Sequence, residues 1–233
     1  DRLEIREVSE SNRAAISVVG DVEYSGFYEW KEGLRVSGIL KSISFYKQEA
    51  DLNYALVRRQ SLSGKVSFLD FSPNKILKSP NSEADLLLAQ RDRLIVLSRT
   101  DESKRERTIR PLLEELRQEG KPGLGIPSVR VLGMVHFPGE YPYTPDMTVG
   151  DLIVAGGGMT ASAYTVSAEL SRQTVDLNAS SPMASIRHTN LSSLLSENTL
   201  ATKLRAKDVL SIKPIPSWSE KNTIEILGEV QFP

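Results

Sequence analysis

The alternation of apolar and polar residues is clearest over residues 128–172, where it predicts a compact strand–strand–helix–strand unit. Val129, Val131 and Val135 recur on one face at the two-residue period of a half-buried strand. Pro138-Gly139 then predicts a tight turn into a second strand at residues 140–143, because proline fixes one φ and glycine frees the next. We therefore expect a β-hairpin here, with Gly139 at positive φ and harder to replace than Pro138.

A short helix is predicted directly after this hairpin, over residues 149–154. Thr148 is a favourable N-cap, and Asp151 three residues later completes a capping box. The three glycines at 156–158 end the helix, and a third strand follows at 168–172. An exposed loop or edge at 174–184, a strand at 185–191 and a helical turn at 192–197 complete the predicted unit.

The strand pattern recurs at residues 16–26, 129–139 and 224–233. Each copy reads β-branched, polar, apolar, apolar, Gly, any, Val, any, aromatic, with its glycine at Gly20, Gly133 or Gly228. A spacing of about 100 residues is typical of small domains in tandem rather than of a solenoid of short repeats. The third copy contains the first strand only.

The first unit follows the same plan. We expect strands at 26–30, 54–59, 65–71 and 94–99 and helices at 34–40 and 73–78, the latter capped by Ser72. When the two units are aligned, Arg58 is equivalent to Arg172, and Asp92 is equivalent to Asp208 at the start of the last strand. A further helix is predicted from Thr108 to just before Gly120.

That helix has an apolar stripe of three leucines, which predicts that it lies on a neighbouring domain. The stripe is Leu112, Leu113 and Leu116. Its charged face is expected to expose residues of both signs: Arg105, Arg107, Arg110, Arg117, Glu114, Glu115 and Glu119. Ion pairs between this face and a neighbouring subunit would each be worth under about 1 kcal/mol, so we expect the chain alone to be monomeric or weakly associating.

Two separate cores are predicted. One should contain Val129, Val131, Leu152, Ile153 and Val209 or Leu210. The other should contain Val18, Val36, Ile39 and Ile95.

The segments VRVLGMVHFPGEY, TVGDLIVAGGGMT and AELSR, which begin at residues 129, 148 and 168, together resemble the soluble-ligand-binding β-grasp (SLBB) module of bacterial polysaccharide-export proteins. The resemblance extends over residues 129–215 and, more weakly, over 15–99. It implies an α+β fold of tandem β-grasp (ubiquitin-like) SLBB domains joined by a helical linker. The expected domains are 1–100 and 128–216, with a linker at 101–127 and the start of a third repeat at 217–233.

Composition restricts the chemistry. The 233 residues include no cysteine, which excludes disulfides and thiolate sites, and 29 basic against 30 acidic residues give no overall field to attract nucleic acid. The longest apolar runs, at 86–89 and 94–97, are far shorter than the roughly 20 residues of a membrane span. Because the chain begins at Asp1 and ends within the third copy of the pattern, we expect it to be part of a longer protein.

We expect no catalytic site, metal or cofactor. The glycines at 156–158 follow a helix, whereas a phosphate loop precedes one. His136 and His188 have no cluster of further ligands around them, and no serine lies in a nucleophile motif. Glu114 and Glu115 have arginines within one turn, which is typical of a solvated, salt-bridged face.

Aromatic residues near the predicted hairpins are the candidate contact residues for a carbohydrate or a partner protein. They are Tyr24, Phe27, Tyr28 and Trp30 in the first unit and Phe137, Tyr141 and Tyr143 in the second. Flat rings with polar tips stack on sugar faces or on another protein. The alternative is that these rings fill the cores.

The resemblance implies a non-catalytic periplasmic segment of an outer-membrane polysaccharide-export protein, whose domains line a ring-shaped conduit. The implied partners are the polysaccharide chain, an inner-membrane polysaccharide co-polymerase and further SLBB repeats, with a homo-oligomer in the full-length protein. A small-ligand-binding β-grasp module attached to an enzyme, of cobalamin-binding or redox type, is the alternative.

Overall fold

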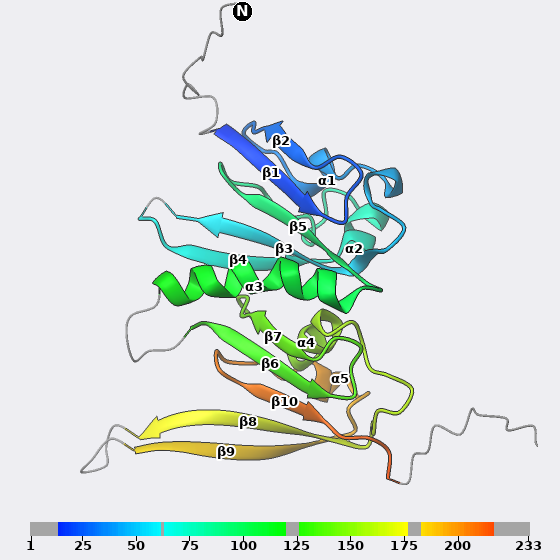
Figure 1. The fold of residues 1–233 in the computed structure, drawn as a ribbon, viewed down its shortest axis with the longest axis vertical. Helices are drawn as coiled ribbons and strands as arrows, with labels where there is room; N and C mark the ends of the chain where they lie inside the picture. Colours follow the sequence, from blue (N-terminus) through cyan, green and yellow to red (C-terminus); the bar gives the residue numbers. More distant parts are fainter. Residues whose placement is uncertain (1–13, 62, 120–125, 177–182, 217–233) are drawn as a thin grey trace, which may run out of the picture.

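The computed structural model describes residues 14–61, 63–119, 126–176 and 183–216. Two five-stranded sheets lie one beyond the other, with the long helix α3 (Glu102–Glu119) between them (Figure 1). The strand order is β2-β1-β5-β3-β4 in the first sheet and β7-β6-β10-β8-β9 in the second, which is the same order in both. The fold is α+β, and the sequence repeat corresponds to a structural repeat.

The first unit contains β1 (Ala15–Gly20), β2 (Gly26–Glu29), α1 (Val36–Ile39), the 3-10 turn η2 (Ile43–Phe45), β3 (Ala50–Gln60), β4 (Val66–Phe71), α2 (Pro73–Lys78) and β5 (Arg93–Ser98). The second contains β6 (Ser128–Gly133), β7 (Gly139–Pro142), α4 (Val149–Ala155), β8 (Ser167–Asp176), β9 (Met183–Ser192), α5 (Glu197–Leu200) and β10 (Val209–Ile212). In both sheets the first strand pairs antiparallel with the second and parallel with the last.

The predicted helix caps are confirmed. The Ser72 side chain accepts a hydrogen bond from the Lys75 backbone at the start of α2, and Thr148 and Asp151 form a complete capping box on α4. Helix α3 starts six residues before the predicted position, because the Asp101 carboxylate accepts a hydrogen bond from the Lys104 backbone N–H at 2.9 Å and so caps an earlier turn.

Three other predicted elements have different bounds. Helix α1 is confined to Val36–Ile39, and the predicted helical turn at 192–197 is instead α5 at Glu197–Leu200. Residues 174–184 were predicted as an exposed loop or an edge. The structure places strand at both ends of this segment, since β8 continues to Asp176 and β9, the edge strand, begins at Met183 in a ten-residue antiparallel ladder. Polar residues do not exclude a strand here, because residues 185–190 of β9 are all exposed and neither face of the strand is buried along them. The predicted third repeat lies outside the described residues.

The positive φ predicted for Gly139 is wrong. Gly139 begins β7 without a left-handed φ, and a Cβ built there meets no atom within 4 Å. The constrained position is instead the glycine of the repeat. Gly20 and Gly133 have φ of 96° and 86°, and a Cβ at either would lie 1.9 Å from the Val96 carbonyl oxygen or 2.0 Å from that of Ile212, respectively. The close backbone approach occurs where the first strand leaves the sheet beside the last one.

The predicted cores are confirmed with one exception. Val129, Val131, Leu152, Ile153 and Leu210 share one cluster, while Val209 is only partly buried. A second cluster contains Val18, Val36 and Ile39, but Ile95 is not part of it. Ile95 lies on the opposite face of the first sheet, because strand residues alternate and Leu94 and Val96 take the inner face.

Helix α3 covers that opposite face. The cluster on this side joins residues of the first sheet, Tyr54, Leu56, Val66, Phe68, Ile95 and Leu97, to Ile109, Leu112, Leu113 and Leu116 of α3 and to the core of the second unit. The predicted leucine stripe is therefore confirmed as a contact surface. β5 is apolar over four consecutive residues, as expected of a strand that is buried on both faces, whereas β10 carries Ser211 where β5 has Ile95.

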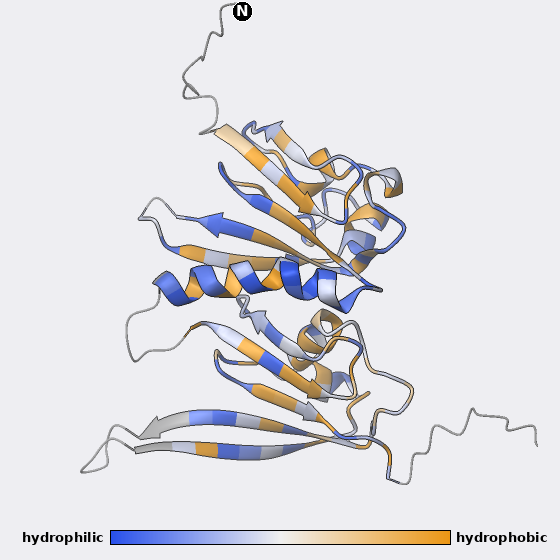
Figure 2. Ribbon diagram, viewed as in Figure 1, coloured by the Kyte–Doolittle hydropathy of each residue, from blue (hydrophilic) through white to orange (hydrophobic). Residues whose placement is uncertain are grey.

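The hydropathy of the residues differs between the two units and α3. Apolar residues concentrate on the strands and short helices of the two units, whereas much of α3 is polar (Figure 2). Among the described residues, no helix combines the length and apolar character required to cross a membrane.

A buried aspartate immediately precedes the last strand of each unit, as predicted. Arg59 contacts Asp92 through Nε at 3.0 Å and Nη2 at 2.6 Å, and Arg172 contacts Asp208 at 2.9 and 2.6 Å. The predicted match of Arg58 with Arg172 is thus wrong by one residue. Arg58 points to the other face of the sheet and forms an ion pair with Glu115 of α3.

Candidate functional site

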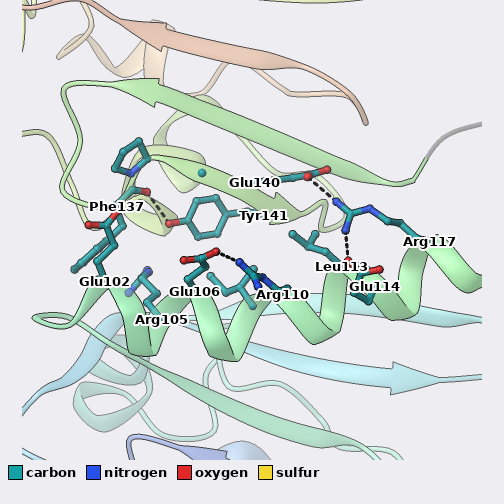
Figure 3. Close-up of a pocket in the computed structure, with 13 residues that line it drawn as sticks. Glu102, Arg105, Glu106, Arg110, Leu113, Glu114, Arg117, Phe137, Glu140 and Tyr141 are labelled. Atoms are coloured by element: carbon teal, nitrogen blue, oxygen red, sulfur yellow. Dashed lines mark hydrogen bonds and ion pairs between the residues drawn. The ribbon is translucent and has the colours of Figure 1, made fainter.

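A groove of about 330 Å³ lies between α3 and the β6–β7 hairpin (Figure 3). Residues of α3 at helical spacing form one wall: Glu102, Arg105, Glu106, Ile109, Arg110, Leu113, Glu114 and Arg117. Residues 137–141 form the other wall, so the predicted hairpin and the predicted helix meet at this site. A volume of this size is within the range of ligand pockets, which is about 300–1,000 Å³.

Two aromatic rings of the hairpin form the floor of the groove. Phe137 and Tyr141 are both buried, and the Tyr141 hydroxyl donates a hydrogen bond to the Phe137 carbonyl oxygen at 2.8 Å. Burial raises the pKa of Tyr141, and the nearby Arg105 opposes this shift only in part. The hydroxyl therefore remains a proton donor at neutral pH, and it holds the hairpin in one shape.

Arg105 lies behind this floor and is 1 % exposed, so the prediction that it is exposed on the charged face of the helix is wrong. Its guanidinium bonds Asp51 of β3 at 2.8 Å, the Ser98 carbonyl at 2.6 Å and the carbonyl of Ala155 at the end of α4. The same group lies 4.7 Å from the centroid of the Phe137 ring. One side chain thus joins the first unit, α3 and the second unit.

The rim of the groove carries charges of both signs. Arg110 forms an ion pair with Glu106 along the helix. Arg117 bridges Glu114 at 2.7 Å and Glu140 of β7 at 3.1 Å. The Arg110–Glu106 and Arg117–Glu114 side chains are 43–69 % exposed, so each of these two pairs contributes under about 1 kcal/mol, whereas Glu140 is 20 % exposed.

The structure distributes the predicted aromatic residues over four places: the two cores, the exposed surface of the first unit and the groove. Trp30 packs against the first core and donates to the Leu88 carbonyl at 2.8 Å, while Tyr28 packs beside it. Tyr143 packs against the second core, with its hydroxyl 3.3 Å from the Leu204 carbonyl.

Tyr24 and Phe27 are 60 % and 77 % exposed on the first unit, away from the groove. Of the seven residues, the groove brings together only Phe137 and Tyr141.

The sequence predicted Arg110, Arg117 and Glu114 as exposed charges but did not place them at a groove, and it did not predict that Arg105 is buried. Asp101, as a helix N-cap, was the signal that could have placed Arg105 in the first full turn.

A partly buried carboxyl, Asp70 at the end of β4, lies where the two units meet. Burial raises the pKa of Asp70 above its ordinary value of 3.8, and Asp151 of the second unit adds to this effect, while the Thr144 hydroxyl opposes it. The folded state therefore binds the Asp70 proton more tightly than the unfolded state does. Stability from this group is present below about pH 3.8 and is lost as the pH rises through the folded pKa.

We accordingly expect Asp70→Asn to raise the free energy of unfolding at pH 7, with a smaller gain at pH 3.5. Urea unfolding at the two pH values measures the difference. Asp146→Asn is the matched control, because Lys203 lowers the pKa of the exposed Asp146 and removing that pair should slightly lower stability at pH 7. A gain for Asp70→Asn that is equal at both pH values would contradict the assignment.

The histidines lie apart from the groove. His188 Nδ1 is 2.6 Å from Glu169 Oε1 and 2.9 Å from Ser171 Oγ on the exposed face of the second sheet. Both contacts use the same ring nitrogen, so the three residues do not form a relay from acid through imidazole to hydroxyl. Within the described ranges no group of three or more His, Cys, Asp or Glu side chains could hold a metal ion.

A comparison with protein families finds a match over the segment that forms the hairpin, α4 and the strands that follow it. The family model for the SLBB domain matches residues 128–187. No curated protein matches the chain. The matched segment extends from β6 into β9 and includes the Phe137 and Tyr141 floor of the groove. Residues 128–187 are therefore similar to the SLBB domain, which suggests a ligand-binding module.

Proposed function

We propose that this chain is a non-catalytic binding segment of a bacterial polysaccharide-export protein, which acts in the periplasm as part of an outer-membrane-associated assembly. The observation that carries the proposal is the groove itself. The hairpin of the SLBB-matched unit places two aromatic rings opposite a helix whose rim holds hydrogen-bonding charges of both signs. Apolar floors with a few polar groups are typical of sites that bind carbohydrates and peptides.

In this proposal both units are β-grasp SLBB domains, and α3 is the helical linker between them. The identical strand orders and the equivalent Arg59–Asp92 and Arg172–Asp208 pairs support a common origin. The polysaccharide chain is the proposed ligand. The inner-membrane co-polymerase, further SLBB repeats and other copies of the full-length protein are the proposed partners.

A glycan array followed by calorimetry tests the binding function. Wild-type protein should bind a subset of bacterial oligosaccharides, and Arg110→Ala or Arg117→Ala should weaken that binding about tenfold, which corresponds to about 1.4 kcal/mol. Arg107→Ala is the matched control, because Arg107 is exposed on the same helix but does not line the groove. No glycan bound, or equal losses in all three variants, would contradict the proposal.

A further inference from the structure

Phe137 also lines a second hollow, of about 500 Å³, which lies between the two units. The first unit and the segment after β5 contribute Gln48, Asp51, Asn53, Asn74 and Arg99. The second unit contributes His136, Val154 and the turn at Gly157 and Gly158. This wall is fixed by backbone hydrogen bonds from His136 to Gly158 and from Phe137 to Gly156, at 3.1 and 2.8 Å.

In the part of the chain that the structure describes, the hollow contains one charged group without a counter-ion, and that group, Arg99, is positive. Asp51 carries the negative charge, but Arg105 bonds its Oδ2 at 2.8 Å, and the backbone N–H groups of Asn53 and Tyr54 bond its Oδ1. Arg99 is exposed, and within the described residues its guanidinium has no hydrogen-bond or ion-pair partner. The hollow therefore offers a fork of free donors to an anion.

Uncharged polar groups surround this arginine. Asn74 Nδ2 donates to Asn53 Oδ1 at 3.0 Å, which leaves the Asn53 amide nitrogen and the Asn74 amide oxygen directed to other partners. Gln48 and the His136 ring are exposed at the same hollow. Amides that offer both donors and acceptors suit the hydroxyl groups of a sugar, each of which donates and accepts.

We propose that this hollow binds an acidic saccharide, with the carboxylate of a hexuronate on Arg99 and ring hydroxyls on the Asn53 and Asn74 amides. The inference rests on the proposed carbohydrate-binding function and names its ligand class. Val154, which is 37 % exposed, supplies most of the apolar surface against which a sugar ring packs, since Phe137 also lines the hollow but is buried. Because both units contribute to the lining, the site depends on how they are packed, and Arg105 contributes to that packing through its bonds to Asp51 and to the Ala155 carbonyl.

Calorimetry of the whole chain with trigalacturonate, maltotriose and inorganic phosphate tests the inference. Trigalacturonate should bind, and Arg99→Gln should weaken it at least tenfold while maltotriose and phosphate bind weakly or not at all. Arg107→Gln is the control for loss of one exposed positive charge elsewhere. Among the described residues neither arginine has a side-chain partner in another element, so both variants should retain the wild-type melting temperature.

Each other outcome has a distinct meaning. Trigalacturonate binding that Arg99→Gln leaves unchanged, or that Arg107→Gln weakens equally, would overturn the site. Maltotriose bound as tightly as trigalacturonate would overturn the acidic preference while leaving carbohydrate binding intact, and phosphate bound as tightly would reduce the hollow to a simple anion site. Binding of none of these, with no hit on the glycan array, would overturn the proposed function as well.

Discussion

Replacing Arg105 by methionine should lower the free energy of unfolding by about 3–5 kcal/mol, because it leaves a buried carboxylate without its partner. Asp51 is 4 % exposed, and Arg105 supplies its ion pair. The substitution also removes the hydrogen bonds to the carbonyls of Ser98 and Ala155, which belong to different units. Urea unfolding followed by circular dichroism measures the loss.

Two further variants make the result specific. Arg107→Met, two residues away on the exposed side of α3, should change stability by no more than about 0.5 kcal/mol. Arg105→Met combined with Asp51→Asn should recover part of the loss, since replacing both partners of a buried pair is less costly than removing one. Additive losses in the double variant would show that the two side chains do not act as a pair.

Replacing Gly133 by alanine should destabilise the second unit by at least about 3 kcal/mol, through a left-handed φ and a steric overlap together. The added Cβ would lie 2.0 Å from the Ile212 carbonyl oxygen, which belongs to backbone that pairs with β6. Gly20→Ala should have a similar effect in the first unit, where the distance to the Val96 oxygen is 1.9 Å. The melting temperatures of the wild type, Gly133→Ala and Gly20→Ala, measured by thermal unfolding, test this prediction.

Gly139→Ala is the matched control for these two variants. A Cβ at Gly139 meets nothing within 4 Å, so its cost should stay below about 1 kcal/mol. If Gly139→Ala lowered the melting temperature as much as Gly133→Ala, the turn rather than the strand end would be the constrained position.

Local signals in the sequence predicted much of the fold. Ser72-Pro73 and Thr148 with Asp151 specify helix starts through hydrogen bonds to their own backbone, so these helices begin where predicted. The repeat around Gly20 and Gly133 identified the two units. These signals act within a few residues and do not depend on tertiary contacts.

The errors concern residues whose positions depend on contacts between the units. Ile95 fits either face of a strand, and only the four-residue apolar run of β5 indicates that both faces are covered. Arg105 is charged and was therefore predicted to be exposed. The sequence alone does not show that Asp51 and the carbonyls of Ser98 and Ala155 all contact its guanidinium. Composition likewise does not predict the two hollows beside Phe137, since their walls come from separate units.

Chemical-shift mapping tests most directly the central claim that this chain binds carbohydrate where its two units meet. ¹⁵N-labelled protein would be titrated with the oligosaccharide that binds most tightly on the array. We predict saturable shifts at Arg99, along the groove-facing side of α3 and at residues 136–141, with few shifts elsewhere. Shifts confined to the β1–β2 hairpin around Tyr24 and Phe27 or to the exposed face of the second sheet, or no saturable shifts at all, would contradict it.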